Sequence, residues 1–124
     1  MSTQTILIID DDPVVADMFG EAFRLNGFKG DVFIDSSEAL SAFNSNSDKY
    51  QTVICDMRMP RKSGIEIAVE IKKLNPLVRV ILMADDKKDY DNAILPSEIS
   101  DRFVTKPEDV GGALKLISDI NKAN

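Results

Sequence analysis

Nearly unbroken runs of apolar residues, without the polar alternation of a half-exposed strand, most constrain how this chain can fold. The clearest runs are Ile6–Ile9, Val53–Cys55 and Val78–Met83, and weaker ones occur at Val32–Ile34 and Arg102–Thr105. Runs of this kind are typical of strands that are covered by other elements on both faces. They predict a parallel sheet of five strands.

Apolar residues spaced three and four apart lie between those runs and predict helices. One pattern follows Pro13 and closes at Asn26–Gly27, and a shorter one covers Glu38–Phe43. Two more run from Ile67 to Leu74 and from Leu114 to Ile120. Strand and helix thus alternate about five times, which predicts an α/β doubly wound sheet with right-handed crossovers.

The segment from Asp85 to Asp101 is the weakest of these units. It is polar, and Pro96 falls inside its only plausible helix. Because proline interrupts a helix interior, we expect this helix to be short, kinked or mobile.

The composition excludes several classes of function. The chain of 124 residues has 21 acidic and 15 basic residues and a net charge of −6, which argues against a broad nucleic-acid or membrane surface. Its single cysteine, Cys55, cannot form an internal disulfide, and the N-terminus lacks a basic flank and a long apolar region. A cytoplasmic protein is expected. With no histidine, any bound metal would be a hard ion held by oxygen atoms.

Carboxylates collect where two of the predicted strands end. Asp10, Asp11 and Asp12 follow the first strand, and Asp56 ends the third. Asp12 directly precedes Pro13, so a role as helix N-cap explains it. Asp56 taken alone could be a solvated loop acid. However, the doubly wound order would bring Asp10, Asp11 and Asp56 into one pocket, where mutual repulsion favours binding of Mg²⁺.

A lysine follows the last predicted strand. Lys106 lies in "FVTKP", where an ordinary surface charge is the simpler interpretation. If the five strands close as predicted, its ammonium can reach the acidic pocket and pair with a carboxylate or a phosphoryl oxygen. Ser63 and Glu66, after Asp56, have the spacing of a capping box that opens the third helix.

The motifs "ILIIDDDP", "VICDMRMPRKSGIE" and "FVTKP", in this order, resemble the receiver domain of two-component response regulators. The resemblance runs from about Thr5 to Asn121. It implies that residues 1–124 form a single receiver domain with the flavodoxin-like fold, in which the strand order is 2-1-3-4-5. It also implies a phosphoacceptor signalling domain of a phosphorelay rather than a true enzyme.

The resemblance implies roles for five residues. Asp56 would be the phosphoacceptor that becomes a 4-aspartylphosphate, and Lys106 would contact the phosphoryl group. Mg²⁺ would be held by Asp11 directly, by Asp10 largely through water, by Asp56 and by the backbone carbonyl of Arg58. In this arrangement the metal and the lysine stabilise charge on the transferring oxygens.

The resemblance also implies partners. The phosphodonor would be a histidine kinase or a phosphotransfer protein. A downstream protein would bind the face formed by the fourth helix, the fifth strand and the fifth helix, and the domain itself would contact neither nucleic acid nor membrane. The Lys106–Pro107 bond is often cis in this family.

One position departs from the family pattern. The fourth strand of a receiver normally ends in a Thr or Ser that binds a phosphoryl oxygen, and we align Met83 with it, followed by the usual Ala84. The hydroxyl is coupled in receivers to an aromatic residue on the fifth strand, which Phe103 matches. A thioether cannot donate a hydrogen bond, so phosphorylation could occur yet be poorly transmitted. Alternatively, Met83 simply fills the core.

Three residues are expected at the rim of the pocket: Arg58, Ala84 and Asp85. We hypothesise that Arg58 and Asp85 pair across its mouth and slow hydrolysis of the phosphoryl group.

Two other functions compete with phosphorylation signalling. The first is a degenerate receiver that acts as a phosphorylation-independent interaction module. The second is a small Mg²⁺-dependent phosphatase with an Asp nucleophile, which is disfavoured because Arg58 stands where a general acid would be needed. A flavin site fits less well, because the first loop is acidic rather than rich in glycine and hydroxyl groups.

Overall fold

The five predicted strands form one parallel sheet. The computed structural model describes residues 5–86 and 102–122, and the sheet order within them is β2-β1-β3-β4-β5. The strands are β1 Thr5–Ile9, β2 Lys29–Phe33, β3 Thr52–Asp56, β4 Arg79–Ala84 and β5 Arg102–Thr105. The fold class and the strand order predicted from the sequence are confirmed. Residues 87–101, and with them most of the segment in which we expected a short or kinked helix, lie outside the described residues.

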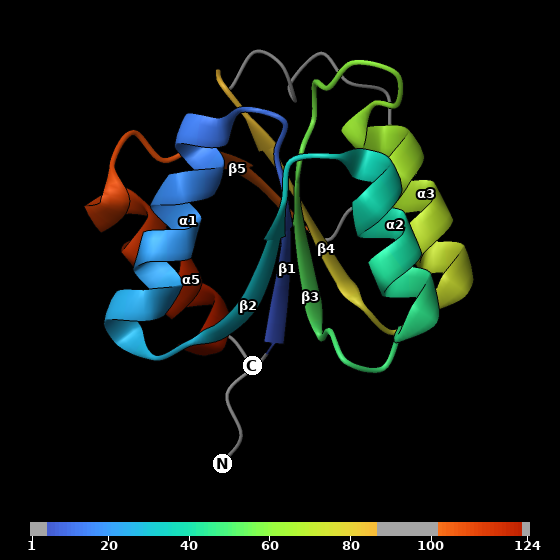
Figure 1. Cartoon of the computed structure of the whole chain (residues 1–124), viewed down its shortest axis with the longest axis horizontal. Coiled ribbons are helices and arrows are strands. Elements are labelled where there is room, and N and C mark those ends of the chain that lie inside the picture. Colours follow the sequence, from blue (N-terminus) through green and yellow to red (C-terminus); the bar gives the residue numbers. More distant parts are fainter. Residues whose placement is uncertain (1–4, 87–101, 123–124) are drawn as a thin grey trace.

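Within the described residues, four helices cover the two faces of this sheet. Helices α1 (Pro13–Asn26) and α5 (Val110–Lys122) lie together on one face, and α2 (Ser36–Ser45) and α3 (Gly64–Leu74) lie on the other (Figure 1). In the described part of the chain, no helix has the length and apolar character needed to cross a membrane. Each face of the sheet is therefore closed by a helix pair.

The core consists of two layers, one on each side of the sheet. Ile6 and Ile8 of β1 pack toward α1 and α5, whereas Leu7 and Ile9 pack toward α2 and α3, and all four are fully buried. Successive side chains of a strand point to opposite faces, so a strand covered on both sides is apolar at every position. This explains the unbroken runs in the sequence.

Two predicted helix caps are present. The carboxylate of Asp12 accepts a hydrogen bond from the backbone N–H of Val14 at 2.9 Å, at the start of α1. Ser63 and Glu66 form a reciprocal capping box at the start of α3. Both interactions satisfy backbone N–H groups that a helix leaves without partners at its first turn. The two caps fix the chain where it leaves β1 and where it enters α3.

Candidate functional site

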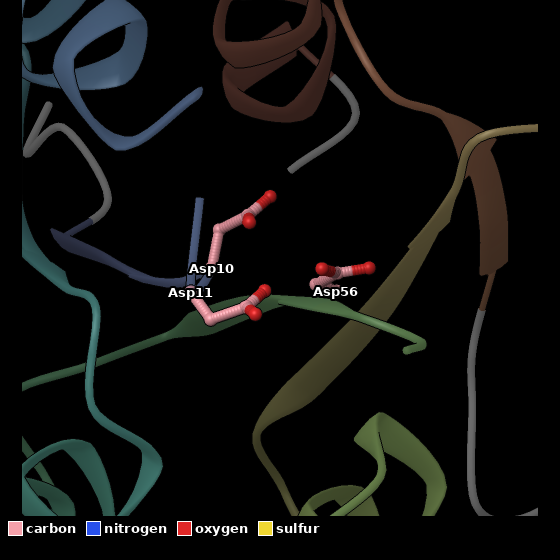
Figure 2. Close-up of side chains that lie close together, drawn as sticks. All are labelled: Asp10, Asp11 and Asp56. Carbon is pink, nitrogen blue, oxygen red and sulfur yellow. The ribbon is translucent and has the colours of Figure 1, made fainter. Parts of the chain in front are cut away.

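Three carboxylates meet at the carboxyl edge of the sheet. Ile9 pairs with Cys55 in the register of β1 and β3, so the residues that follow, Asp10 and Asp56, lie level with each other. One oxygen each of Asp10, Asp11 and Asp56 lies within 4.8 Å of the other two. Figure 2 shows the three carboxylates turned toward a common space. Asp10 and Asp56 are buried, whereas Asp11 is exposed.

Lys106 reaches into this acidic cluster from the end of β5. Its Nζ donates to Asp56 Oδ2 at 2.9 Å and lies 3.4 Å from Asp10 Oδ2. The lysine side chain is only 13% exposed. Asp56 Oδ1 in addition accepts a hydrogen bond from the backbone N–H of Arg58 at 3.2 Å. Lys106 is thus not an ordinary surface charge. Both carboxylate oxygens of Asp56 accept a hydrogen bond.

Burial shifts the pKa values of the residues in this cluster. Burial, with the charge of Asp56 adding to it, raises the pKa of Asp10 to about 6. Burial also raises the pKa of Asp56, against the opposing effect of Lys106. Burial lowers the pKa of Lys106, but the hydrogen bond to Asp56 and the charge of Asp10 outweigh it and raise this pKa to about 12. One ammonium does not neutralise three converging carboxylates.

The donor set fits a hard divalent cation. Asp10 Oδ2 is buried and, among the described residues, has no hydrogen-bond partner, although it lies within ion-pair distance of Lys106. Carboxylate oxygens are the ligands that Mg²⁺ and Ca²⁺ prefer. A divalent ion between the three acids would satisfy this oxygen and stabilise the charged form of the buried carboxylates.

The loop after Asp56 is held in place by close packing of α3. A Cβ atom at Gly64 would lie 2.2 Å from the carbonyl oxygen of Asp56, so only glycine allows this approach. The Gly64 N–H donates to the Met57 carbonyl at 3.0 Å, and the Met57 N–H donates to the Met83 carbonyl at 2.8 Å. These contacts fix the backbone that carries the Asp56 carboxylate.

The structure corrects the expectation for Met83. Its side chain is fully buried in the core layer under α1 and α5, whereas Phe103 packs in the layer under α2 and α3. Side chains on opposite faces of a sheet cannot be coupled by direct contact. Ala84 is the residue at the end of β4 that shares the face of Phe103. The alignment of Met83 with the hydroxyl position is therefore wrong by one residue, and Ala84, which also lacks a hydroxyl, takes its place.

The rim of the pocket contains an ion pair that the sequence did not reveal. Asp85 Oδ1 lies 3.8 Å from Lys106 Nζ. Ala84 pairs with Thr105 in the register of β4 and β5, which places the two following residues side by side. The sequence contains both residues but not this register, so the contact could not be found from it. The hypothesised pairing of Arg58 with Asp85 stays a prediction.

The expected cis bond before Pro107 is absent. No peptide bond among the described residues is cis, so the Lys106–Pro107 bond is trans. The trans isomer is the ordinary form, favoured before proline by about 0.5–1 kcal/mol.

Comparison with known proteins identifies the family. The sequence model of the response regulator receiver domain family matches residues 6–118 of this chain. The chain belongs to the response regulator receiver family. Receiver domains act as phosphoacceptors rather than true enzymes, and they pair with histidine kinases. The acidic pocket of Asp10, Asp11 and Asp56 is consistent with aspartate phosphorylation in a two-component system.

Solved structures and curated proteins agree with this assignment. A response regulator receiver domain protein from Clostridium thermocellum is 30% identical, with a TM-score of 0.80 over 97% of this chain and 95% of that one. The response regulator TrrA from Thermotoga maritima, solved in complex with Mg²⁺ and BeF, is 29% identical, with a TM-score of 0.80 over 98% and 100% of the two chains.

Curated relatives are longer proteins. The probable transcriptional regulatory protein TcrX of Mycobacterium tuberculosis is 29% identical over 83% of this chain and 43% of its own length. The regulator GlrR of Escherichia coli is 27% identical over 92% of this chain but only 25% of its own length. The receiver chain thus spans less than half of these two relatives. The prediction that residues 1–124 form a single domain stays a prediction.

Proposed function

We propose that this receiver accepts a phosphoryl group on Asp56 from a phosphohistidine of a histidine kinase or phosphotransfer protein. The observation that carries the proposal is the position of the buried Asp56 carboxylate, between two further acids and the ammonium of Lys106 at 2.9 Å. The roles of Lys106, Arg58 and the metal ligands rest on this geometry together with the family resemblance.

The transfer exchanges one bond of phosphorus for another. A carboxylate oxygen of Asp56 attacks the phosphorus and forms a P–O bond as the P–N bond breaks, and the electron pair of that bond stays on the departing imidazole nitrogen. Lys106 pairs with an oxygen of the transferring group and stabilises its negative charge. The backbone N–H of Arg58 keeps the Asp56 carboxylate in position for the attack.

Mg²⁺ is the proposed cofactor. Asp11 would bind it directly, Asp10 largely through water, and Asp56 and the backbone carbonyl of Arg58 would complete the protein ligands. The unpartnered Asp10 Oδ2 and the convergence of the three acids support this assignment. The bound ion supplies positive charge to the oxygens of the transferring group.

The proposed downstream partner binds the face that includes β5 and α5, and the proposed compartment is the cytoplasm, where receiver domains typically act. Phe103, half-buried on β5, would connect the site with this face.

A second function is a receiver that binds its partner independently of phosphorylation. The observation that favours it is the end of β4, where neither Met83 nor Ala84 offers a hydroxyl to a phosphoryl oxygen. A hydrogen bond to a charged group contributes about 1.5–3 kcal/mol, which is comparable with the bias that shifts a two-state equilibrium. Loss of this hydrogen bond would weaken the conformational response to phosphorylation while leaving the chemistry at Asp56 intact.

Intact mass after incubation with acetyl phosphate and Mg²⁺ tests the chemistry, with Asp56→Asn as the control. We expect one phosphoryl adduct that is lost in the variant and in EDTA; equal adducts in the wild type and Asp56→Asn would refute the proposal. Amide spectra with Mg²⁺ and beryllofluoride then separate the two functions. Shifts that reach Phe103 and α5 indicate a switch, whereas shifts confined to the pocket favour the phosphorylation-independent module.

A further inference from the structure

Asp85 lies beside Lys106 at the rim of the acidic cluster. The register of β4 and β5 sets this position, and the Lys106 N–H donates to the Ala84 carbonyl at 2.9 Å, which ties the two strand ends together. The Asp85 carboxylate lies 3.8 Å from Lys106 Nζ, and its side chain is 75% exposed. With Lys106 it lines a cavity of about 230 Å³ at the end of β5. Asp85 is therefore a solvent-exposed acid in contact with the lysine.

Lys106 makes ion-pair contacts with three carboxylates at increasing distances. Asp56 lies at 2.9 Å, Asp10 at 3.4 Å and Asp85 at 3.8 Å. The Asp10 and Asp56 side chains are 0% and 4% exposed, so the surrounding core leaves them little room to move away. Asp85 is the exposed member of the three, so an incoming phosphoryl group would displace it first.

We propose that Asp85 is a specificity-determining residue that disfavours small, doubly charged phosphodonors by competing with them for Lys106. The inference rests on the proposed phosphorylation of Asp56 and adds a selectivity to it. A doubly charged donor meets the negative charge of Asp85 at the mouth of the site and must also displace it from the ammonium. A donor protein can offset this charge with basic groups beside its phosphohistidine, which a small anion lacks.

The expected effect follows from Coulomb's law. A unit charge about 7 Å from a doubly charged group, in a dielectric close to that of water, changes the rate of encounter by about sevenfold in low salt. Screening reduces this to about twofold at physiological ionic strength, where the Debye length is about 8 Å. For a singly charged donor the interaction energy is half as large, so the corresponding change in rate is about two- to threefold in low salt.

The test compares two donors on the full chain. Initial rates of adduct formation are measured by intact mass with acetyl phosphate, which is doubly charged at neutral pH, and with phosphoramidate, which is singly charged. The variants are Asp85→Asn, which removes the charge, and Asp85→Glu, which retains it. Asp48→Asn is the matched control, because Asp48 is an exposed acid in the turn between α2 and β3, at the opposite edge of the sheet.

In low salt we expect Asp85→Asn to react about seven times faster with acetyl phosphate and about two to three times faster with phosphoramidate, with a weaker salt dependence than the wild type. Asp85→Glu and Asp48→Asn should stay close to the wild-type rate. An unchanged rate in Asp85→Asn, or an equal gain with both donors, would overturn the inference and leave the proposed function intact. If no variant forms an adduct with either donor, the proposed function itself fails.

Discussion

Replacement of Lys106 by methionine should destabilise the fold strongly in the absence of metal. The substitution keeps most of the side-chain volume and removes the ammonium that lies 2.9 Å from Asp56 and 3.4 Å from Asp10. At an effective dielectric constant of about 20, each contact contributes roughly 5 kcal/mol of attraction, most of which offsets the cost of removing the charges from water.

The net loss is smaller than these attractions. Removing one partner of a buried ion pair typically costs about 3–5 kcal/mol. In the variant one of the carboxyls can take up a proton, because burial already raises the pKa of both. We therefore expect the free energy of unfolding to fall by about 3 kcal/mol at pH 7.5.

Urea denaturation in EDTA and in Mg²⁺ measures this loss. A cation at a hundred times its dissociation constant stabilises the fold by about 2.7 kcal/mol. Because it also substitutes for the missing ammonium, Mg²⁺ should narrow the gap between Lys106→Met and the wild type. The control is Lys115→Met, which removes an 81% exposed lysine paired with Asp119 and should cost under about 0.5 kcal/mol. If both substitutions cost the same in EDTA, Lys106 does not hold the cluster together and the reasoning is refuted.

Three further predictions concern the scaffold. Gly64→Ala should lower the free energy of unfolding by about 2–4 kcal/mol, measured in urea, because the new Cβ would lie 2.2 Å from the Asp56 carbonyl oxygen and force the backbone apart. Ser63→Ala removes the capping box of α3 and should cost about 1 kcal/mol in the same assay. Asp31 has a pKa lowered by hydrogen bonds from Lys49 and Tyr50, so its stabilisation is present above the unfolded pKa of about 4 and is lost as the pH falls through the lower folded value. Asp31→Asn should therefore cost about 0.5–1 kcal/mol at pH 7, and thermal denaturation should show this cost shrinking below about pH 4.

The fold and most of the cluster could be predicted because both depend on patterns that one sequence contains. Unbroken apolar runs alternating with helical spacing define a doubly wound sheet, and the carboxyl ends of its strands meet at one edge. Asp10 and Asp11 after β1, Asp56 at the end of β3 and Lys106 after β5 therefore meet as the sequence predicts.

Two features could not be predicted, because each depends on the exact register of a strand: the face on which Met83 lies and the contact of Asp85 with Lys106. A strand that is apolar at every position does not reveal which face a given side chain occupies, and a shift of one residue reverses the face. This is why Met83 was aligned with the hydroxyl position although Ala84 shares the face of Phe103. The contact of Asp85 with Lys106 depends in the same way on how β4 and β5 align.

The central claim is that Asp56 itself carries the phosphoryl group, and chemical trapping tests it most directly. Borohydride reduces an aspartyl phosphate to homoserine, which peptide mass mapping can locate in the chain. After treatment with acetyl phosphate and Mg²⁺, the account predicts homoserine at position 56 and none in EDTA. Homoserine at another acid, such as Asp11, would contradict it.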